Sequence, residues 1–360
     1  MAPAALLSPS ITPAGATPPT VLGPSTKKAT RPTKKIPQSI IDNARLTQRR
    51  PFKPSEDLIY ESPTKIHTMA ELGLEGAGIS PNAISEPFPL FTEEATRQMR
   101  AEVFSEPVLQ DCQYASSFCT NMVRGMGHVR APFIYDVWKS PEVLSKVSAI
   151  AGIDLIPAFD YEIANINIAA KDDPVESDAT NIDGPGVAKP AEQEEDDAPA
   201  FAWHYDSFPF VCVTMLSDCT GMVGGETAIK LPSGDVKKVR GPAMGYAVVM
   251  QGRYIYHQAL KALGGRERIS MVTPFRPRDP LVRDETILVG VRGISNLGEM
   301  FPQYFEYRLD VLEERVRMQR KEERAREVAG KPFDVEKKRR WLEEQRGFIE
   351  SMLAEMFVPE

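Results

Sequence analysis

Short strand-like runs in the middle of the chain constrain its fold more than any other feature. Residues 210–216 are apolar and rich in β-branched side chains, as expected of a buried strand, and residues 245–250 repeat this pattern. Residues 161–168 alternate, so that Asn165 and Asn167 would share one face of a strand. Helical patterns lie on both sides of this region. The sequence therefore predicts a mainly β fold with flanking helices.

Two of the four histidines lie beside these runs, together with an aspartate. His204 and Asp206 are two residues apart, so strand geometry directs both side chains to one face and Tyr205 to the other. His257 is expected to end the strand-like stretch 245–256. Two imidazoles and one carboxylate on one face would leave about three coordination positions open, which suits a non-haem iron(II) site. A structural zinc site would favour four protein ligands, usually with cysteines.

A basic and a hydroxyl side chain follow on what reads as the next strand. Arg268 and Ser270 would share a face within residues 266–270. A guanidinium binds a carboxylate through two parallel hydrogen bonds, and a nearby hydroxyl adds a third. The pattern predicts a binding site for the carboxylate of a small acid, with Arg268 as its anchor.

These assignments have alternatives. His257 could be a core histidine satisfied by backbone groups. Arg268 could form a surface ion pair with Glu267 or Asp279. Arg266 could be the anchor instead, although the two glycines before it favour a turn at that position.

In this order and spacing, the residues resemble the iron(II)/2-oxoglutarate-dependent dioxygenases. The resemblance covers roughly residues 201–277: His-x-Asp, a histidine 51 positions after Asp206, and then Arg-x-Ser. Gly-Gly-Glu-Thr at 224–227 is similar to a hairpin of the prolyl-hydroxylase branch. The middle of the chain looks like a fungal-type branch of this superfamily.

The resemblance implies a double-stranded β-helix core, the jelly-roll or cupin-like fold. It also implies iron(II), 2-oxoglutarate and O2 as cofactor and co-substrates. His204, Asp206 and His257 would be the catalytic metal ligands. Arg268 would bind 2-oxoglutarate with help from Ser270.

Asn165 and Asn167 are further candidates for this co-substrate, because related enzymes place polar residues on the equivalent strand. The alternative is that the two amides only satisfy neighbouring backbone groups. The expected function is oxidation, in the first instance hydroxylation, of a small organic molecule in specialised metabolism, with release of succinate and CO2. A protein (prolyl-type) or nucleic-acid hydroxylase is one alternative. A non-catalytic interaction protein on the same fold is another.

The rest of the chain divides by composition. Residues 1–57 are rich in Pro, Ser, Thr and basic side chains, and they are expected to form a disordered tail because they bury too little apolar area to offset their ordering entropy. Residues 58–300 are expected to hold the dioxygenase domain. An acidic insertion at 171–200, with ten acids and two lysines, would be mobile. Residues 301–360 read as a helical extension.

The flanking helices have clear end signals. Ser140 and Pro141 open one helix, and Gly152 ends it. The extension predicts helices at 303–328 and 335–356, which would pack on the same chain or form a homodimer with a second subunit. The expected apolar sides are Phe305, Leu309, Leu312 and Val316 in the first, and Trp341, Phe348, Met352 and Met356 in the second.

Charge and cysteine usage narrow the partners and the compartment. The net charge of −7 gives no bulk attraction to nucleic acid or to an anionic membrane, and no apolar run reaches the length of a membrane span. The four cysteines lack a metal-binding spacing, which favours reduced thiols in an intracellular enzyme. A cytoplasmic protein with a small-molecule substrate is expected, and basic pairs in the tail keep a nuclear location open.

Overall fold

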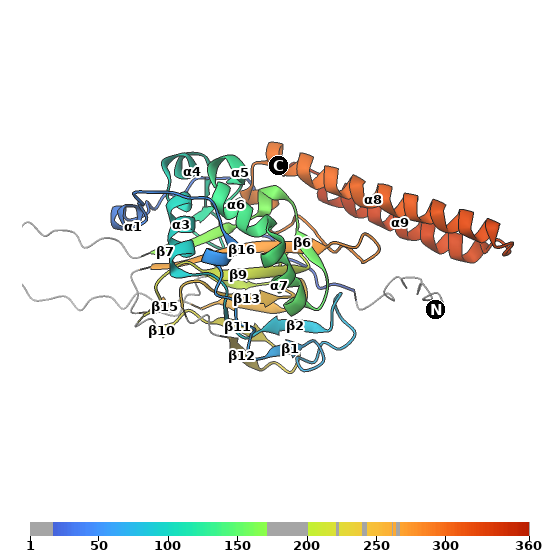
Figure 1. Ribbon diagram of the computed structural model, residues 1–360, viewed down its shortest axis with the longest axis horizontal. Helices are drawn as coiled ribbons and strands as arrows, with labels where there is room; N and C mark the ends of the chain where they lie inside the picture. Colours follow the sequence, from blue (N-terminus) through green and yellow to red (C-terminus); the bar gives the residue numbers. More distant parts are fainter. Residues whose placement is uncertain are drawn as a thin grey trace, which may run out of the picture.

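The computed structural model describes residues 17–170, 201–220, 223–239, 243–260, 262–263 and 267–359. Within these residues, two antiparallel sheets make up most of the body, and helices flank them (Figure 1). The prediction of a mainly β fold with flanking helices is confirmed. The acidic insertion 171–200 and residues 1–16 lie outside the described residues.

The larger sheet forms the centre of the body. Its strand β16 (Glu267–Pro277) pairs with β7 (Asn165–Ala170) on one side and with β9 (Phe210–Met215) on the other. Since β7, β9 and β16 are the runs read as strands in the sequence, the apolar pattern located them correctly. From one edge of the sheet, β1 (Ile66–Thr68), β2 (Asn82–Ser85) and β13 (Tyr246–Met250) precede β9. Toward the other edge, β5 (Met122–Val123) and β4 (Gln113–Tyr114) follow β7. In addition, β3 (Phe88–Pro89) pairs with β13, and β6 (Leu155–Pro157) pairs with β16.

The smaller sheet lies across a cavity from the larger one. Thr227 and His257 line this cavity from the smaller sheet, and Asn167, Val213 and Ser270 line it from the larger. The two sheets therefore share one internal site. The smaller sheet has the order β12 (Val236–Val239), β11 (Thr227–Lys230), β14 (Tyr256–Ala259) and β8 (Phe201–His204), and a separate pair is formed by β10 (Val223–Gly224) and β15 (Ala262–Leu263).

Helices cover the larger sheet on the face away from the cavity. Trp138 of α6 (Pro132–Lys139) is fully buried and makes edge contacts with Phe91 and with Phe275 of β16. In α7 (Pro141–Ala151), the Ser140 hydroxyl caps the first turn and Gly152 ends the helix with φ of 71°, as predicted. The other helices of this layer are α3 (Glu93–Val103), α4 (Glu106–Asp111) and α5 (Gly127–Arg130).

The structure differs from the predicted disordered tail over residues 17–57. Ile40 of α1 (Gln38–Asn43) is buried in the main core, and the Asp57 side chain at the end of α2 (Pro54–Asp57) is buried in an ion pair with Arg50. The composition of this segment predicts that it cannot build a core of its own. Composition does not predict that the few apolar side chains of the segment are buried in the domain. The same segment brings Leu22 to the cavity.

Two long antiparallel helices form a C-terminal arm that extends away from the body (Figure 1). They are α8 (Leu297–Val328) and α9 (Val335–Glu355). Phe348 and Met352 of α9 are buried, as predicted.

The predicted apolar side of α8 is wrong. The helix instead buries Tyr304, Tyr307, Arg308 and Val311. The tyrosine rings supply apolar surface, and the Arg308 guanidinium can be buried because it forms an ion pair with Asp284. The helix also begins at Leu297 rather than at residue 303, with Asn296 as its cap. In the described part of the chain, no helix has both the length and the apolar character to cross a membrane.

Candidate metal centre

The three predicted ligands meet at one end of the smaller sheet. His204 is the last residue of β8, and it lies directly opposite His257 of β14 in the strand register. Residues opposite each other in an antiparallel pair project to the same face. Asp206 follows β8 by two residues, and its backbone N–H donates to the Gly252 carbonyl at 3.0 Å.

The expectation that His257 ends the stretch 245–256 is wrong. The strand β13 ends at Met250, and a tight turn closed by a hydrogen bond from Tyr254 N–H to the Gln251 carbonyl separates it from β14. His257 is therefore the second residue of a strand in the other sheet. This change of sheet is what brings it beside His204.

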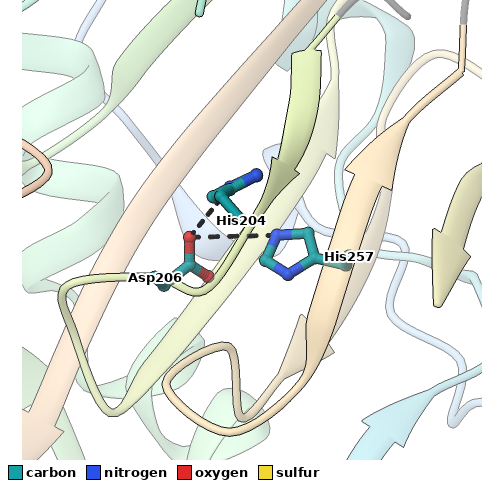
Figure 2. A group of neighbouring side chains, drawn as sticks. All are labelled: His204, Asp206 and His257. Atoms are coloured by element: carbon teal, nitrogen blue, oxygen red, sulfur yellow. Dashed lines mark ion pairs between the residues drawn. The ribbon is translucent and has the colours of Figure 1, made fainter. Parts of the chain in front are cut away.

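The donor atoms converge on one point. His204 Nε2 lies 3.4 Å and His257 Nε2 lies 3.8 Å from the same Oδ1 of Asp206, and Figure 2 shows both rings joined to that carboxylate. One potential ligand atom from each residue lies within 4.8 Å of the others. Three donors this close, on one side of an open cavity, can all contact a single metal ion.

Backbone carbonyls fix which ring nitrogen is free. Nδ1 of His204 lies 2.7 Å from the Ala202 carbonyl oxygen, and Nδ1 of His257 lies 2.9 Å from that of Ile255. A carbonyl oxygen only accepts, so each Nδ1 carries the proton and donates it. The lone pair of each Nε2 is then directed toward Asp206, which is the arrangement that a metal-binding histidine needs.

Charge and burial also fit a cation. Burial, and next the neighbouring His204, lower the pKa of His257 to about 4, so its imidazole is neutral at neutral pH. Burial opposes ionisation of Asp206, but the adjacent His257 and His204 and the nearby Arg253 outweigh it and lower its pKa. Oδ2 of Asp206 is buried and has no hydrogen-bond partner in the described part of the chain. A buried carboxylate oxygen without a donor is costly unless a cation neutralises it.

Arg268 is a buried cation without an acidic partner among the described residues. Its side chain is 8% exposed, and Nη1 donates to Ser270 Oγ at 3.4 Å, while Nε has no partner. Glu267 pairs instead with Arg100 at 2.6 Å, so the predicted alternative of a surface ion pair is wrong. Such a guanidinium can pair with an anionic ligand that enters the cavity. Arg266 lies outside the described residues.

The two candidate asparagines both line the cavity, but they differ in their contacts. Asn167 lies opposite Ser270 in the β7–β16 register and lines the cavity. Asn165 donates through Nδ2 to the Glu162 carboxylate at 2.8 Å and to the Glu162 carbonyl at 3.2 Å. Glu162 in turn accepts from Arg124 at 2.6 Å. Asn165 therefore supports a buried ion pair, and Asn167 is the better placed of the two to meet a ligand beside Ser270.

Several residues of the cavity could not be found from the sequence. The Phe118 ring lies 6.2 Å from that of His204, and Arg124 lines the same cavity. Gly252 is the closest constraint on the metal ligands, because a Cβ atom there would lie 1.8 Å from Asp206 Oδ2. None of these residues carries a local pattern, since each reaches the site only through the fold.

The neighbouring aromatic side chains and the other two histidines contribute no ligand atom to the cluster, although Tyr205 lines the cavity. The Trp203 ring stacks on Tyr256 at 5.4 Å, and Tyr205 lies 4.9 Å from the same ring. His67 bonds to Glu86, and His128 packs on a tyrosine. Thr227, from the Gly-Gly-Glu-Thr sequence, begins β11 and lines the cavity.

Comparisons with known proteins give only distant likenesses. No family model matches the chain, and no curated protein matches it. A 2OG-Fe(II) oxygenase-family oxidoreductase from Burkholderia pseudomallei is 14% identical, with a TM-score of 0.30 over 43% of this chain and 66% of that one. A Pseudomonas putida prolyl-4-hydroxylase is 14% identical, with a TM-score of 0.32 over 52% and 88%.

A third structure, AviO1 from Streptomyces viridochromogenes, is 12% identical, with a TM-score of 0.35 over 59% of this chain and 96% of that one. At these identities and TM-scores the likeness assigns no function. The chain's own geometry has to carry that assignment.

Replacing Gly252 with alanine should displace the Asp206 carboxylate, because the new methyl group would occupy the position of Oδ2. We expect the affinity for Fe(II) to fall about 10- to 100-fold, the effect typical of mutating a residue that orients a metal ligand. Anaerobic calorimetric titration with Fe(II) measures this. Gly347→Ala is the matched control, since nothing lies within 4 Å of a Cβ atom at that position. Equal Fe(II) affinity in both variants would show that Asp206 is not a ligand.

Proposed function

We propose that this protein is a non-haem iron(II)- and 2-oxoglutarate-dependent dioxygenase with a jelly-roll core. One observation carries the proposal: a single cavity holds three converging metal donors and a buried guanidinium that lacks an acidic partner in the described part of the chain. A metal site alone would leave Arg268 unexplained. An anion site alone would leave Oδ2 of Asp206 and two directed imidazoles unexplained.

In this proposal His204, Asp206 and His257 hold the iron. They contribute one negative charge, so a divalent ion keeps a net positive charge that attracts an anionic chelator. The three donors come from one side, which leaves the remaining positions open toward the cavity. Bound iron, with 2-oxoglutarate and O2, supplies the oxidative chemistry that yields succinate, CO2 and an oxidised substrate.

Arg268 binds the carboxylate of 2-oxoglutarate that is remote from the metal. Ser270 and Asn167 lie on neighbouring strands at this end of the cavity, so a hydroxyl and an amide can complete the hydrogen bonding. Burial strengthens the charge interaction, because little water competes for the guanidinium. The fixed positions on β16 and β7 orient the co-substrate toward the ligand cluster.

The substrate is proposed to be a small organic molecule. Much of the remaining cavity wall is apolar, including Phe118, Val211, Met250 and Ile294. Apolar walls bind the body of a ligand and keep water from the reacting centre. Oxidation in specialised metabolism fits this site, and hydroxylation is its simplest outcome.

The first test is substrate-independent turnover of the co-substrate. With Fe(II), 2-oxoglutarate, O2 and ascorbate, which supplies the two electrons that a substrate would otherwise provide, the protein should release succinate, and candidate substrates should accelerate this release. His204→Ala should lose both Fe(II) binding and succinate formation, because two ligands are left. Arg320→Ala, at an exposed position on α8, is the matched control and should retain both. If the intact protein bound neither Fe(II) nor 2-oxoglutarate without oxygen, the proposed function would be wrong.

Arg268→Ala should weaken 2-oxoglutarate binding about 10- to 100-fold, because one or two charge-assisted hydrogen bonds are lost. Fe(II) affinity should stay within a few fold of the original. Calorimetric titration of the Fe(II)-loaded protein with 2-oxoglutarate under nitrogen measures the difference. Unchanged 2-oxoglutarate affinity in this variant would transfer the anchor role to Arg266.

A further inference from the structure

The C-terminal arm has an exposed apolar row on each of its helices. On α8, Phe305, Leu309 and Val316 are 43%, 43% and 40% exposed. Leu312, which lies between the last two, is half-buried. The spacing of four, three and four residues keeps all of them on one line along the helix. On α9, Leu342, Ile349 and Leu353 form a second line and are 59%, 43% and 72% exposed.

The two rows lie on the same side of the arm. The helices face each other through Arg308 and Arg315 of α8, whose guanidinium carbons lie 3.6 and 4.4 Å from the Phe348 ring centre of α9. With about 100° per residue, each row lies roughly a quarter turn away from this contact line. The displacement has the same sense along each helix. Because the two helices run in opposite directions, the two quarter turns bring both rows to the same side of the arm. The arm therefore presents one apolar face built from both helices.

A charged row runs beside the apolar row of α8. Its first four members each follow a member of the apolar row by one residue, and its last two continue the spacing of three and four residues. Its six side chains are all exposed. Only Arg317 has an ion-pair partner among the described residues, which is Glu314 on the same helix. The half nearer the body is acidic and the half nearer the tip is basic, in the order Glu306, Asp310, Glu313, Arg317, Arg320 and Arg324.

This order of charges identifies what can cover the face. A second α8 lying parallel and in register would place acids on acids and arginines on arginines. A second α8 lying antiparallel would place the acidic half of each helix along the basic half of the other. A surface that is complementary to itself under a two-fold rotation is the mark of a two-fold homodimer interface.

We propose that the apolar face of the α8–α9 arm docks against the same face of a second copy of this chain, with the two α8 helices antiparallel. The arm projects from the body, so the two bodies would lie at opposite ends of a four-helix bundle (Figure 1). Apolar side chains repeating every three and four residues are those that pack between helices in such bundles. This assignment does not depend on the proposed enzymatic function.

Sedimentation equilibrium of the full-length protein tests the proposal. The expected mass is twice the 40.0 kDa of one chain. Val316→Glu combined with Ile349→Glu should raise the dimer dissociation constant at least about a hundredfold, because four charges would enter the middle of the apolar face, where both side chains are exposed in the single chain. Ala325→Glu is the control: this side chain is exposed on the same arm but lies about half a turn away from the apolar row, so the dimer should persist.

Charge reversal tests the orientation. Replacing Glu306, Asp310 and Glu313 with arginine should weaken the dimer at least about tenfold, and replacing Arg317, Arg320 and Arg324 with glutamate should do the same. Combining all six changes in one chain restores complementarity and should recover the dimer to within about threefold.

Circular dichroism and the midpoint temperature of thermal unfolding would check that each variant is folded. The changed side chains are all exposed in the single chain, so the fold should be retained. A monomer at every concentration, or a dimer unaffected by the paired changes at Val316 and Ile349, would overturn the proposal. Binding of this face to a different protein while the isolated chain stays monomeric would overturn it as well.

Discussion

The register between β8 and β14 is the constraint on which the site depends. It sets His204 directly opposite His257, and a slip of one residue would turn one imidazole to the other face of the sheet. Asp206 can then approach both rings only because Gly252 has no side chain at the point of contact. The two carbonyls that accept from Nδ1 belong to Ala202 and Ile255, each two residues before its histidine. Tautomer, direction and spacing thus all follow from one strand pairing.

The larger sheet and the arm complete the cavity around this pair of strands. Arg268 lies on β16, a strand that pairs on both sides, so its position is fixed before any ligand binds. The loop that brings Val291 to the cavity is held from the arm, where Glu355 accepts from Leu288 N–H at 2.6 Å and pairs with Arg292 at 2.6 Å. The C-terminal helices are therefore linked to the wall of the proposed active site as well as to the proposed dimer.

The sequence predicted what depends on local periodicity. The i, i+2 spacing predicts that His204 and Asp206 lie together, as they do, although Asp206 follows β8 and is not part of it. Cap residues correctly predict the helix that ends at Gly152. It could not predict Gly252 or Phe118, because their places depend on pairings between distant segments. The buried face of α8 differs from the predicted one. Tyr304 and Arg308 carry polar groups, but they bury large apolar surfaces beside Asp284.

In the proposed site, one cavity binds iron through two imidazoles and a carboxylate and binds 2-oxoglutarate beside it. X-ray absorption at the iron edge, on anaerobic Fe(II)-loaded protein, tests it most directly. Two histidine nitrogens are expected in the coordination shell before and after 2-oxoglutarate is added, with water oxygens replaced by those of the co-substrate. A shell with fewer than two imidazoles, or one that 2-oxoglutarate leaves unchanged, would contradict it.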